Sequence, residues 1–309
     1  MRSRVLISVL LLVVVAAEVG AQAIPASLRL RILFAFGGEG DKPGQLRNPQ
    51  GIALDPEGNI YVADTGNNRI QKFDRHGRLL RQIGGFGWGR EQFDRPVDIC
   101  ASSGLDVFVA DYNNERIERY DVHLNYISSY RSDVSVEERL RFGLPLGVAI
   151  SRHGELFVVD GDNRRLLKVN SFGLPELSFG DFRWAQGQLE RPAQVAVSTN
   201  DLVYVVDLGA ESVVVFDYYG NFIRKVGGGA LRAPSGVAVD KQGRVWIADT
   251  GNDRIVVLSA EGRFLGAWGG GGEMLGAFRR PTDVAVGGGR VCVLDAGNCR
   301  VQVFELVGQ

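Results

Sequence analysis

The segment that decides the fold is Ile60-Tyr61-Val62-Ala63-Asp64, an apolar run that ends in an aspartate. The chain repeats this pattern as VFVAD, LFVVD, VYVVD, VWIAD and VCVLD, which end at Asp111, Asp160, Asp207, Asp249 and Asp295. Successive closing aspartates are 47, 49, 47, 42 and 46 residues apart. A period of this length is typical of an array of one structural unit, so length alone does not divide the chain into domains.

Each copy lies between two further apolar runs. About fifteen residues before the aspartate a proline opens the first run, at Pro49, Pro96, Pro145, Pro192, Pro234 and Pro281. After each aspartate come a polar turn and a third run, which reads RIQKF in the first copy and RVQVF in the last. All three runs are rich in β-branched and aromatic residues, which favour strands.

A fourth strand follows a turn that carries glycine in four copies, at Gly77, Gly173, Gly220 and Gly262. Glycine supplies the positive φ that a bulged hairpin needs. Leu124 occupies the corresponding place in the second copy. A side chain there raises the conformational energy by about 1 kcal/mol or more, so we expect this turn to be rebuilt.

Four antiparallel strands in each of six units predict an all-β fold, a six-bladed β-propeller of four-stranded blades. The sixth copy ends after its third strand, at Val301–Leu306. Residues 32–38 match residues 264–270, the fourth strand of blade five, position by position. We expect the N-terminal strand to pair in the last blade and close the ring, so that no blade has an open edge.

The first 23 residues form a predicted export signal. Arg2 and Arg4 precede an apolar run at residues 5–17, and Ala21-Gln22-Ala23 is a small-residue cleavage pattern. The run is shorter than the roughly 20 residues of a spanning helix, so we expect cleavage, with a retained anchor as the alternative. Residues 24–309 then form one propeller, with a closing strand at 28–38 and blades at 46–85, 93–130, 142–180, 189–229, 231–270 and 278–306.

The units resemble NHL repeats, whose signature is a strand-opening proline, a Val-Ala-Asp-like second strand and a Gly-Asn-X-Arg turn. Residues 64–69 (DTGNNR) and 249–254 (DTGNDR) are close matches, and the resemblance covers residues 28–306. The fourth copy has Ala210 and Ser212 where the others have Asn and Arg, so we expect blade four to be irregular. The resemblance implies the fold more strongly than a function, because such propellers include protein-binding, RNA-binding, sensing and lyase proteins.

The resemblance makes one enzyme a candidate, peptidyl-α-hydroxyglycine lyase. This is a zinc enzyme whose histidine ligands follow the strand-opening proline. The equivalent positions here hold Gln50, Val97, Leu146, Ala193, Ser235 and Thr282, which offer no imidazole. The three histidines, His76, His123 and His153, fall in turns at least one blade apart. The motifs His-Glu-X-X-His, Cys-X-X-Cys and Gly-X-Ser-X-Gly do not occur in the sequence. The sequence therefore favours a protein that is not an enzyme.

Polar residues follow the proline by two positions in alternate blades, at Asp98, Gln194 and Asp283, and glycine holds this position in the other blades. Two carboxylates and an amide around a channel can hold a hard divalent cation, which would suit a metal-dependent hydrolase or lyase. They can equally bond to neighbouring backbone or water. We favour the second interpretation and expect no cofactor, with an axial divalent cation as the alternative.

Arginine stands five residues after the closing aspartate in five blades, at Arg69, Arg116, Arg165, Arg254 and Arg300. We expect these side chains to pair with the aspartate or with turn carbonyls, because the guanidinium fork suits such bonds. A ring of exposed arginines that binds an anionic ligand is the alternative.

The connectors between blades form the predicted recognition surface, because long loops on a rigid scaffold often carry binding residues. One connector carries Phe86 and Trp88, and another carries Arg183 and Trp184. Aromatic side chains with a polar edge suit contacts with a peptide or glycan. They can equally pack against their own blade.

The composition restricts the class of partner. The chain has 35 basic and 36 acidic residues, so it lacks the positive excess of a nucleic-acid-binding protein, and three cysteines are too few for a disulfide scaffold. We expect a secreted or periplasmic monomer without a membrane span after signal cleavage. It would bind a protein, peptide or glycan of the cell envelope through its inter-blade loops, and a metal-dependent hydrolase or lyase at the channel mouth is the alternative function.

Overall fold

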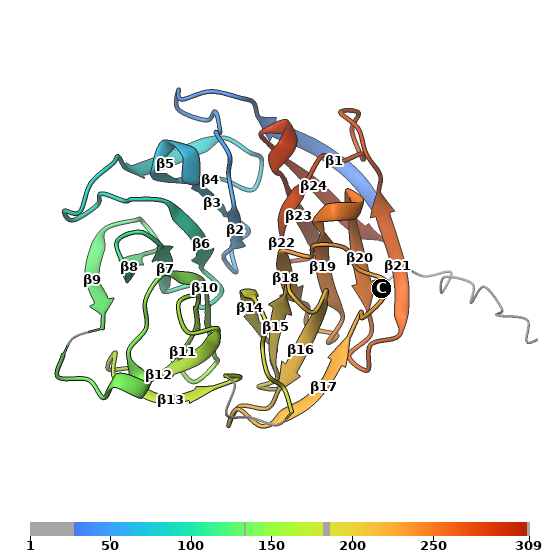
Figure 1. Ribbon diagram of the computed structural model, residues 1–309. Coiled ribbons are helices and arrows are strands. Elements are labelled where there is room, and N and C mark those ends of the chain that lie inside the picture. The colour runs from blue at the N-terminus through green and yellow to red at the C-terminus, as the bar shows by residue number, and fades with distance from the viewer. Residues whose placement is uncertain (1–27, 133, 182–185, 308–309) are drawn as a thin grey trace, which may run out of the picture.

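The computed structural model describes residues 28–132, 134–181 and 186–307. Within these ranges the chain forms six four-stranded antiparallel sheets, which stand around a central axis as the blades of a propeller (Figure 1). The all-β six-bladed fold expected from the repeats is confirmed.

Each blade runs from an innermost strand at the axis to an outermost strand at the rim. Blade one consists of β2 (Gly51–Leu54), β3 (Ile60–Asp64), β4 (Arg69–Phe73) and β5 (Leu79–Gly84). Blade two consists of β6 (Pro96–Cys100), β7 (Asp106–Asp111), β8 (Arg116–Asp121) and β9 (Tyr126–Arg131). Blade three consists of β10 (Pro145–Ile150), β11 (Leu156–Asp160), β12 (Arg165–Val169) and β13 (Pro175–Phe179). Blade four consists of β14 (Pro192–Val197), β15 (Val203–Asp207), β16 (Ser212–Phe216) and β17 (Phe222–Val226). Blade five consists of β18 (Gly236–Val239), β19 (Val245–Asp249), β20 (Arg254–Leu258) and β21 (Phe264–Gly269). Blade six consists of β22 (Pro281–Gly287), β23 (Arg290–Asp295), β24 (Arg300–Val307) and β1 (Arg29–Gly37).

The alternating strand direction gives the propeller two different faces. The connectors between blades and the turns from second to third strand lie on one face, which we call the connector face. The turns from first to second strand and from third to fourth strand lie on the other, which we call the turn face. Every candidate residue therefore belongs to one face or to the axis between them.

Single 3₁₀ turns follow the closing aspartate in three blades, at η1 (Thr65–Asn67), η3 (Thr250–Asn252) and η4 (Ala296–Asn298). Each ends in a left-handed residue, with φ between 50° and 52° at Asn68, Asp253 and Cys299. This conformation returns the chain so that the arginine that opens the third strand lies opposite the aspartate. A fourth turn, η2 (Glu138–Leu140), precedes β10, and no helix of the described ranges has the length and apolar character needed to cross a membrane.

Strand β1 closes the ring. It pairs antiparallel with β24, with Arg29 opposite Val307 and Gly37 opposite Arg300. In Figure 1 this blue strand lies against the red end of the chain. The last blade therefore has four strands, as the predicted closure by the N-terminal strand requires.

The hydrophobic core lies between the blades. One cluster joins Phe157 and Leu166 of blade three to Val205 and Phe216 of blade four. The second and third strands supply most of this burial, and every residue of β3 and β15 is buried. Because each blade packs against its two neighbours, the molecule is stabilised by successive blade interfaces, as in other repeat proteins.

The turn at Leu124 is not rebuilt, so that expectation was wrong. Leu124 adopts φ 61°, close to the 79° of Gly77. Its N–H donates to Asp121 O at 2.9 Å, as Gly77 donates to Asp74 O at 3.0 Å. The leucine side chain is fully buried in the cluster between blades one and two. Burial of a leucine contributes about 2 kcal/mol, enough to offset the backbone penalty.

Blade four keeps the strand pairing of the other blades although its turn departs from the repeat. Asp207 lies opposite Ser212, as Asp64 lies opposite Arg69 in blade one. The difference in sequence therefore changes side chains at the turn and not the register of the sheet.

Candidate functional site

The repeated arginines fasten the connectors to the blades. In blade two, Arg116 Nε donates to Asp111 Oδ2 at 2.8 Å. The other guanidinium nitrogens donate to the carbonyl oxygens of Trp88, Gly89 and Gln92, at 3.1, 3.1 and 2.5 Å. Both side chains of the ion pair are almost fully buried. A guanidinium suits this position because it presents five donors in one plane.

The same arrangement recurs around the ring. In each blade concerned, arginine Nε donates to the closing aspartate at 2.6 to 2.9 Å, and a terminal nitrogen donates to a connector carbonyl; the residues are Arg69, Arg116, Arg165, Arg254 and Arg300. These donors point at oxygen atoms of the protein itself. The geometry therefore favours the structural interpretation of the repeated arginine.

Three connectors share one backbone path, so their side chains can be compared position by position. Residues 38–46, 85–93 and 270–278 each contain one parallel bridge, which joins Glu39 to Leu46, Phe86 to Phe93 and Gly271 to Phe278. The bridging residues at the far ends, Leu46, Phe93 and Phe278, are completely buried. Each connector is thus anchored by one apolar side chain and by arginine bonds to its carbonyls.

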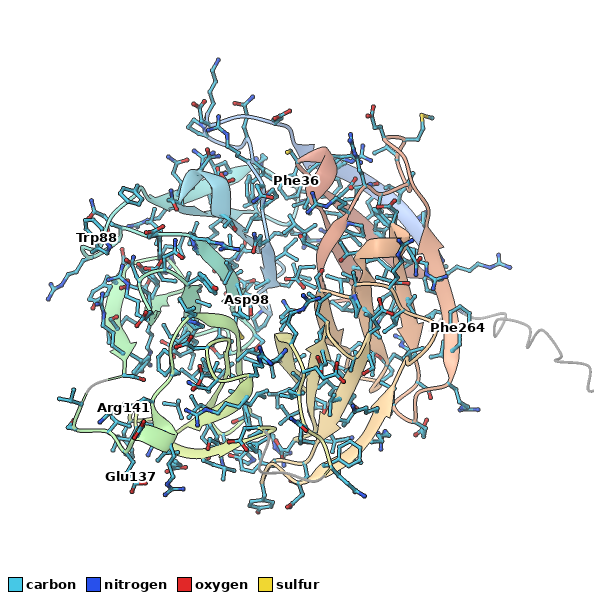
Figure 2. The ribbon with its side chains drawn as sticks, in the orientation of Figure 1. Phe36, Trp88, Asp98, Glu137, Arg141 and Phe264 are labelled. Atoms are coloured by element: carbon cyan, nitrogen blue, oxygen red, sulfur yellow. The ribbon has the colours of Figure 1, made fainter. Side chains whose placement is uncertain are left out.

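The middle connector of this set carries an exposed aromatic pair. Phe86 and Trp88 are 62% and 68% exposed, and their rings meet edge to face with centroids 5.7 Å apart. Figure 2 shows Trp88 at the rim of the molecule. The equivalent positions of the other two connectors hold Glu39, Asp41, Gly271 and Glu273. The backbone path therefore does not depend on the aromatic side chains. The other two connector candidates, Arg183 and Trp184, lie outside the described residues.

The three polar residues predicted around the axis lie in a buried ring. Asp98, Gln194 and Asp283 are at most 9% exposed, and Asp98 is near the centre of the propeller in Figure 2. Gln194 Nε2 donates to Asp98 Oδ1 at 3.1 Å. Each of the three side chains also accepts a backbone N–H from the innermost strand of the next blade, from Val148, Val237 and Ile52 respectively.

These backbone N–H groups need acceptors because an innermost strand has no partner strand on its axial side. Glycine in the alternate blades makes room for the polar side chains. A Cβ on Gly51, Gly147 or Gly236 would lie 2.6 to 2.9 Å from the Cα of the polar residue in the next blade. The threefold alternation in the sequence thus reflects close packing and backbone hydrogen bonds at the axis.

The two carboxylates of the ring hold protons more tightly than exposed ones do. Burial raises the pKa of Asp98 to about 7. Burial also raises the pKa of Asp283, and the negative charge of Asp98 raises it further. The hydrogen bonds that both carboxylates accept oppose this rise without cancelling it.

A divalent cation at the ring would have to share carboxylate oxygens that already accept hydrogen bonds. Asp98 accepts from Val148 and Gln194, and Asp283 accepts from Ile52 and Val284. The ring geometry therefore favours bonding to backbone.

A model of the NHL repeat family matches residues 46–73, 93–120, 231–258 and 278–304. These four segments are NHL repeats. Each matched segment begins in the connector and ends in the third strand, in blades one, two, five and six. The NHL pattern is therefore matched in four consecutive blades of the ring, five, six, one and two.

Curated relatives are similar to short stretches of this chain. E3 ubiquitin-protein ligase TRIM71 of Xenopus tropicalis is 55% identical over 40 residues, which make up 13% of this chain and 5% of that protein. Protein brain tumor of Drosophila melanogaster is 29% identical over 89 residues, 28% of this chain and 9% of that protein. The similarity thus spans a small part of the length of these relatives.

Solved structures with a similar shape include a streptogramin B lyase, with a TM-score of 0.62 and 13% identity over 90% of this chain and 97% of that chain. A structural genomics protein of unknown function from Bacteroides thetaiotaomicron has a TM-score of 0.69 and 14% identity, over 90% of this chain and 76% of that chain. At these identities the likeness shows the fold alone.

One feature of the propeller was not predicted from the sequence, a cavity of about 400 Å³ on the turn face. Arg152, Thr199 and Lys241 line it from three consecutive turns between first and second strands. An alignment of these turns with one another would have shown them at one equivalent position, because the flanking strands fix the register.

Proposed function

We propose that this propeller is a non-enzymatic binding module that docks a protein or peptide segment on its connector face, at Phe86 and Trp88. With the export signal predicted at residues 1–23, it would act in the periplasm or outside the cell. The observation that carries the proposal is the exposed aromatic pair.

The aromatic pair is additional to what the repeat needs. Two connectors with the same path place acidic residues or glycine there, so Phe86 and Trp88 are not required for folding. Exposed tryptophan and phenylalanine side chains that are held in place lose little entropy on binding, and such residues often dominate protein interfaces. Arg116 holds the connector through three carbonyl oxygens, including that of Trp88, so the pair is presented on a rigid support.

The family supports the same proposal in a general way. NHL-repeat proteins often bind proteins, and the relatives that share these repeats include a ubiquitin ligase. The shared stretch covers 5% of that ligase, so its own activity and substrates carry no argument for this chain.

The test is a selection of peptides from a random library on the purified propeller, followed by measurement of their dissociation constants. Phe86→Glu with Trp88→Asp gives the connector the kinds of side chain found at Glu39 and Asp41. We expect this double variant to weaken binding about 100-fold, because central aromatic residues often contribute 2 kcal/mol or more. The control is Phe172→Ser, which removes an aromatic side chain that is 86% exposed on the turn face. Equal losses in both proteins would contradict the proposal.

The alternative function, a metal-dependent hydrolase or lyase, has a separate readout. It requires purified protein to retain stoichiometric calcium or zinc, and Asp98→Asn with Asp283→Asn to abolish that retention. Such a result, together with a lack of selected peptides, would replace the binding proposal with the enzymatic one.

A further inference from the structure

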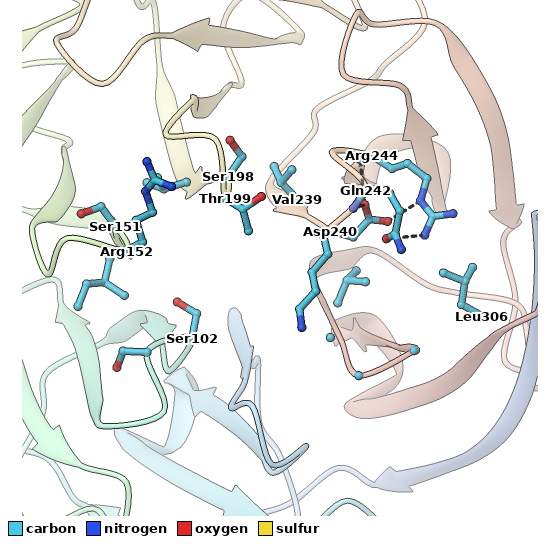
Figure 3. Close-up of a pocket in the computed structure, with 18 residues that line it drawn as sticks. Ser102, Ser151, Arg152, Ser198, Thr199, Val239, Asp240, Gln242, Arg244 and Leu306 are labelled. Carbon is cyan, nitrogen blue, oxygen red and sulfur yellow. Dashed lines mark hydrogen bonds and ion pairs between the residues drawn. The ribbon is translucent and has the colours of Figure 1, made fainter. Parts of the chain in front are cut away.

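The axial channel opens on the turn face into the cavity of about 400 Å³ (Figure 3). Turns between the first and second strands of blades two to six border it. Ile150, Val197, Val239 and Val286 line both this cavity and a narrower one of about 140 Å³ in the channel behind it. The larger cavity has the size of a site for a small molecule.

In the turns of blades three to five the side chain of the first residue, Ser151, Ser198 or Asp240, accepts backbone N–H groups of its own turn. Asp240 Oδ1 accepts the N–H groups of Gln242 and Arg244 at 3.0 and 2.9 Å. Ser151 Oγ accepts those of His153 and Glu155, both at 3.2 Å. The second residues of the five turns are Ser102, Arg152, Thr199, Lys241 and Gly288, and all of them line the cavity.

The cavity has an excess of positive charge. Asp240 is the one acidic residue among the described residues that line it. Its Oδ2 already accepts bonds from Arg244 Nε at 2.6 Å and Trp246 Nε1 at 2.9 Å. Lys241 therefore carries a positive charge that no lining carboxylate offsets, whereas Asp201, from outside the lining, offsets part of the charge of Arg152. Arg152 and Lys241 lie on the turns either side of the one that bears Thr199. In Figure 3, Arg152 and Thr199 lie on neighbouring turns at the edge of the cavity.

Asp201 in the next turn orients Arg152. Its Oδ2 lies 2.7 Å from Arg152 Nη2. Asp201 adopts φ 60° at a place where four other turns have a glycine at positive φ, namely Gly58, Gly104, Gly154 and Gly243. A side chain in this conformation is less favourable than glycine. The Asp201 carboxylate fixes the Arg152 guanidinium at the edge of the cavity.

We propose that this cavity binds a small anionic sugar derivative, a sugar phosphate or a sugar acid. Its phosphate or carboxylate lies on the arc formed by Arg152, Thr199 and Lys241, because cationic donors form the strongest hydrogen bonds to oxyanions. Ser102 and Gln242 offer partners for sugar hydroxyls. At Gly288 an added Cβ would meet nothing within 4 Å, so that side of the cavity stays open for entry.

Calorimetric titrations with glucose 6-phosphate, glucuronate, glucose and inorganic phosphate test this proposal. We expect at least one anionic sugar to bind with a dissociation constant of about 1 mM or lower, and glucose to bind at least about tenfold more weakly. The tighter of the two anionic sugars identifies the anionic group. If inorganic phosphate binds as tightly as glucose 6-phosphate, or if neither anionic sugar binds at about 10 mM, the proposal is overturned.

Variants locate the site. Arg152→Gln and Lys241→Gln should each weaken binding of the anionic sugar about tenfold or more, and Lys241→Arg should largely retain it. Lys225→Gln is the matched control, because it removes an exposed lysine from the outermost strand of blade four. Thermal melting checks that each variant is folded. Unchanged binding in Arg152→Gln with Lys241→Gln, or an equal loss in Lys225→Gln, overturns the assignment.

Discussion

Leu124 combines an unfavourable backbone conformation with a completely buried side chain. Leu124→Gly removes a backbone penalty of about 1–2 kcal/mol but also removes a core side chain, a change that costs about 3–5 kcal/mol in other proteins. We expect the free energy of unfolding to fall by about 1–3 kcal/mol, measured by urea denaturation. A gain in stability would show that the strain of this turn outweighs its packing.

The axial carboxylates make stability depend on pH. Burial raises the pKa of Asp98 to about 7 and raises that of Asp283 as well. An aspartate in the unfolded chain has a pKa of about 4. Between these values the folded state binds more protons than the unfolded state, so the free energy of unfolding falls as pH rises from about 4 to about 7. Below about 4 this contribution is fully present.

Asp98→Asn with Asp283→Asn should remove this part of the pH dependence. Urea denaturation at pH 5 and pH 8 measures it, and we expect the wild type to lose more stability than the variant between these values. Burial also raises the pKa values of Asp111 and Glu118, which both proteins retain, so the difference between the two proteins isolates the ring. Equal losses would contradict the proposed proton binding at the axis.

At the scale of the elements, the connectors depend on single arginines to different degrees. Arg116 donates to three connector carbonyls and its side chain is 4% exposed, whereas Arg254 donates to one and its side chain is 33% exposed. Arg116→Ala removes three connector bonds and leaves two buried carboxylates, Asp111 and Glu118, without their shared cation, so we expect a loss of about 3–5 kcal/mol. Arg254→Ala should lose about 1–2 kcal/mol. Similar losses in urea denaturation would show that the connector bonds do not matter.

The closing strand is the second element on which the ring depends. Deletion of residues 24–38 removes β1 and exposes the edge of β24 together with the buried side chains of Phe304 and Leu306. We expect a large drop in melting temperature and self-association through the open edge, seen by size-exclusion chromatography. Arg31→Ala removes an exposed ion pair with Glu305 and keeps the strand, so it should lose less than about 1 kcal/mol. A monomeric deletion variant with unchanged melting would contradict closure by β1.

At the scale of the whole molecule, the two faces should bind independently. Phe86 and Trp88 belong to the connector face, Arg152 and Lys241 belong to the turn face, and buried blade interfaces lie between them. We expect Phe86→Glu with Trp88→Asp to retain anionic sugar binding, and Arg152→Gln with Lys241→Gln to retain peptide binding, each within about twofold by calorimetry. Loss of both activities in one variant would show that the sites are coupled.

Much of the fold can be predicted from the sequence because the strands and turns of a blade follow one another along the chain. The closing aspartates fix the number of blades, and the match between residues 32–38 and 264–270 assigns β1 to the last blade. The sequence also shows the arginine that recurs in five blades and the alternation of polar residues with glycine at the axis. Leu124 is the counterexample, because its neighbours in blade one determine whether its side chain stabilises the turn.

The sequence by itself determined the repeat, the ring and the positions that differ between blades. The tertiary structure decided what those positions contact. Asp98 bonds to Val148 and Asp283 bonds to Ile52, partners 50 and 231 residues away, and the turn-face cavity is assembled from five blades. The physical reason is that hydrogen bonds within a blade join residues that are close in the sequence, so the local pattern of residues predicts them. The contacts at the axis and on the two faces join residues from distant blades, and they form only when the ring closes.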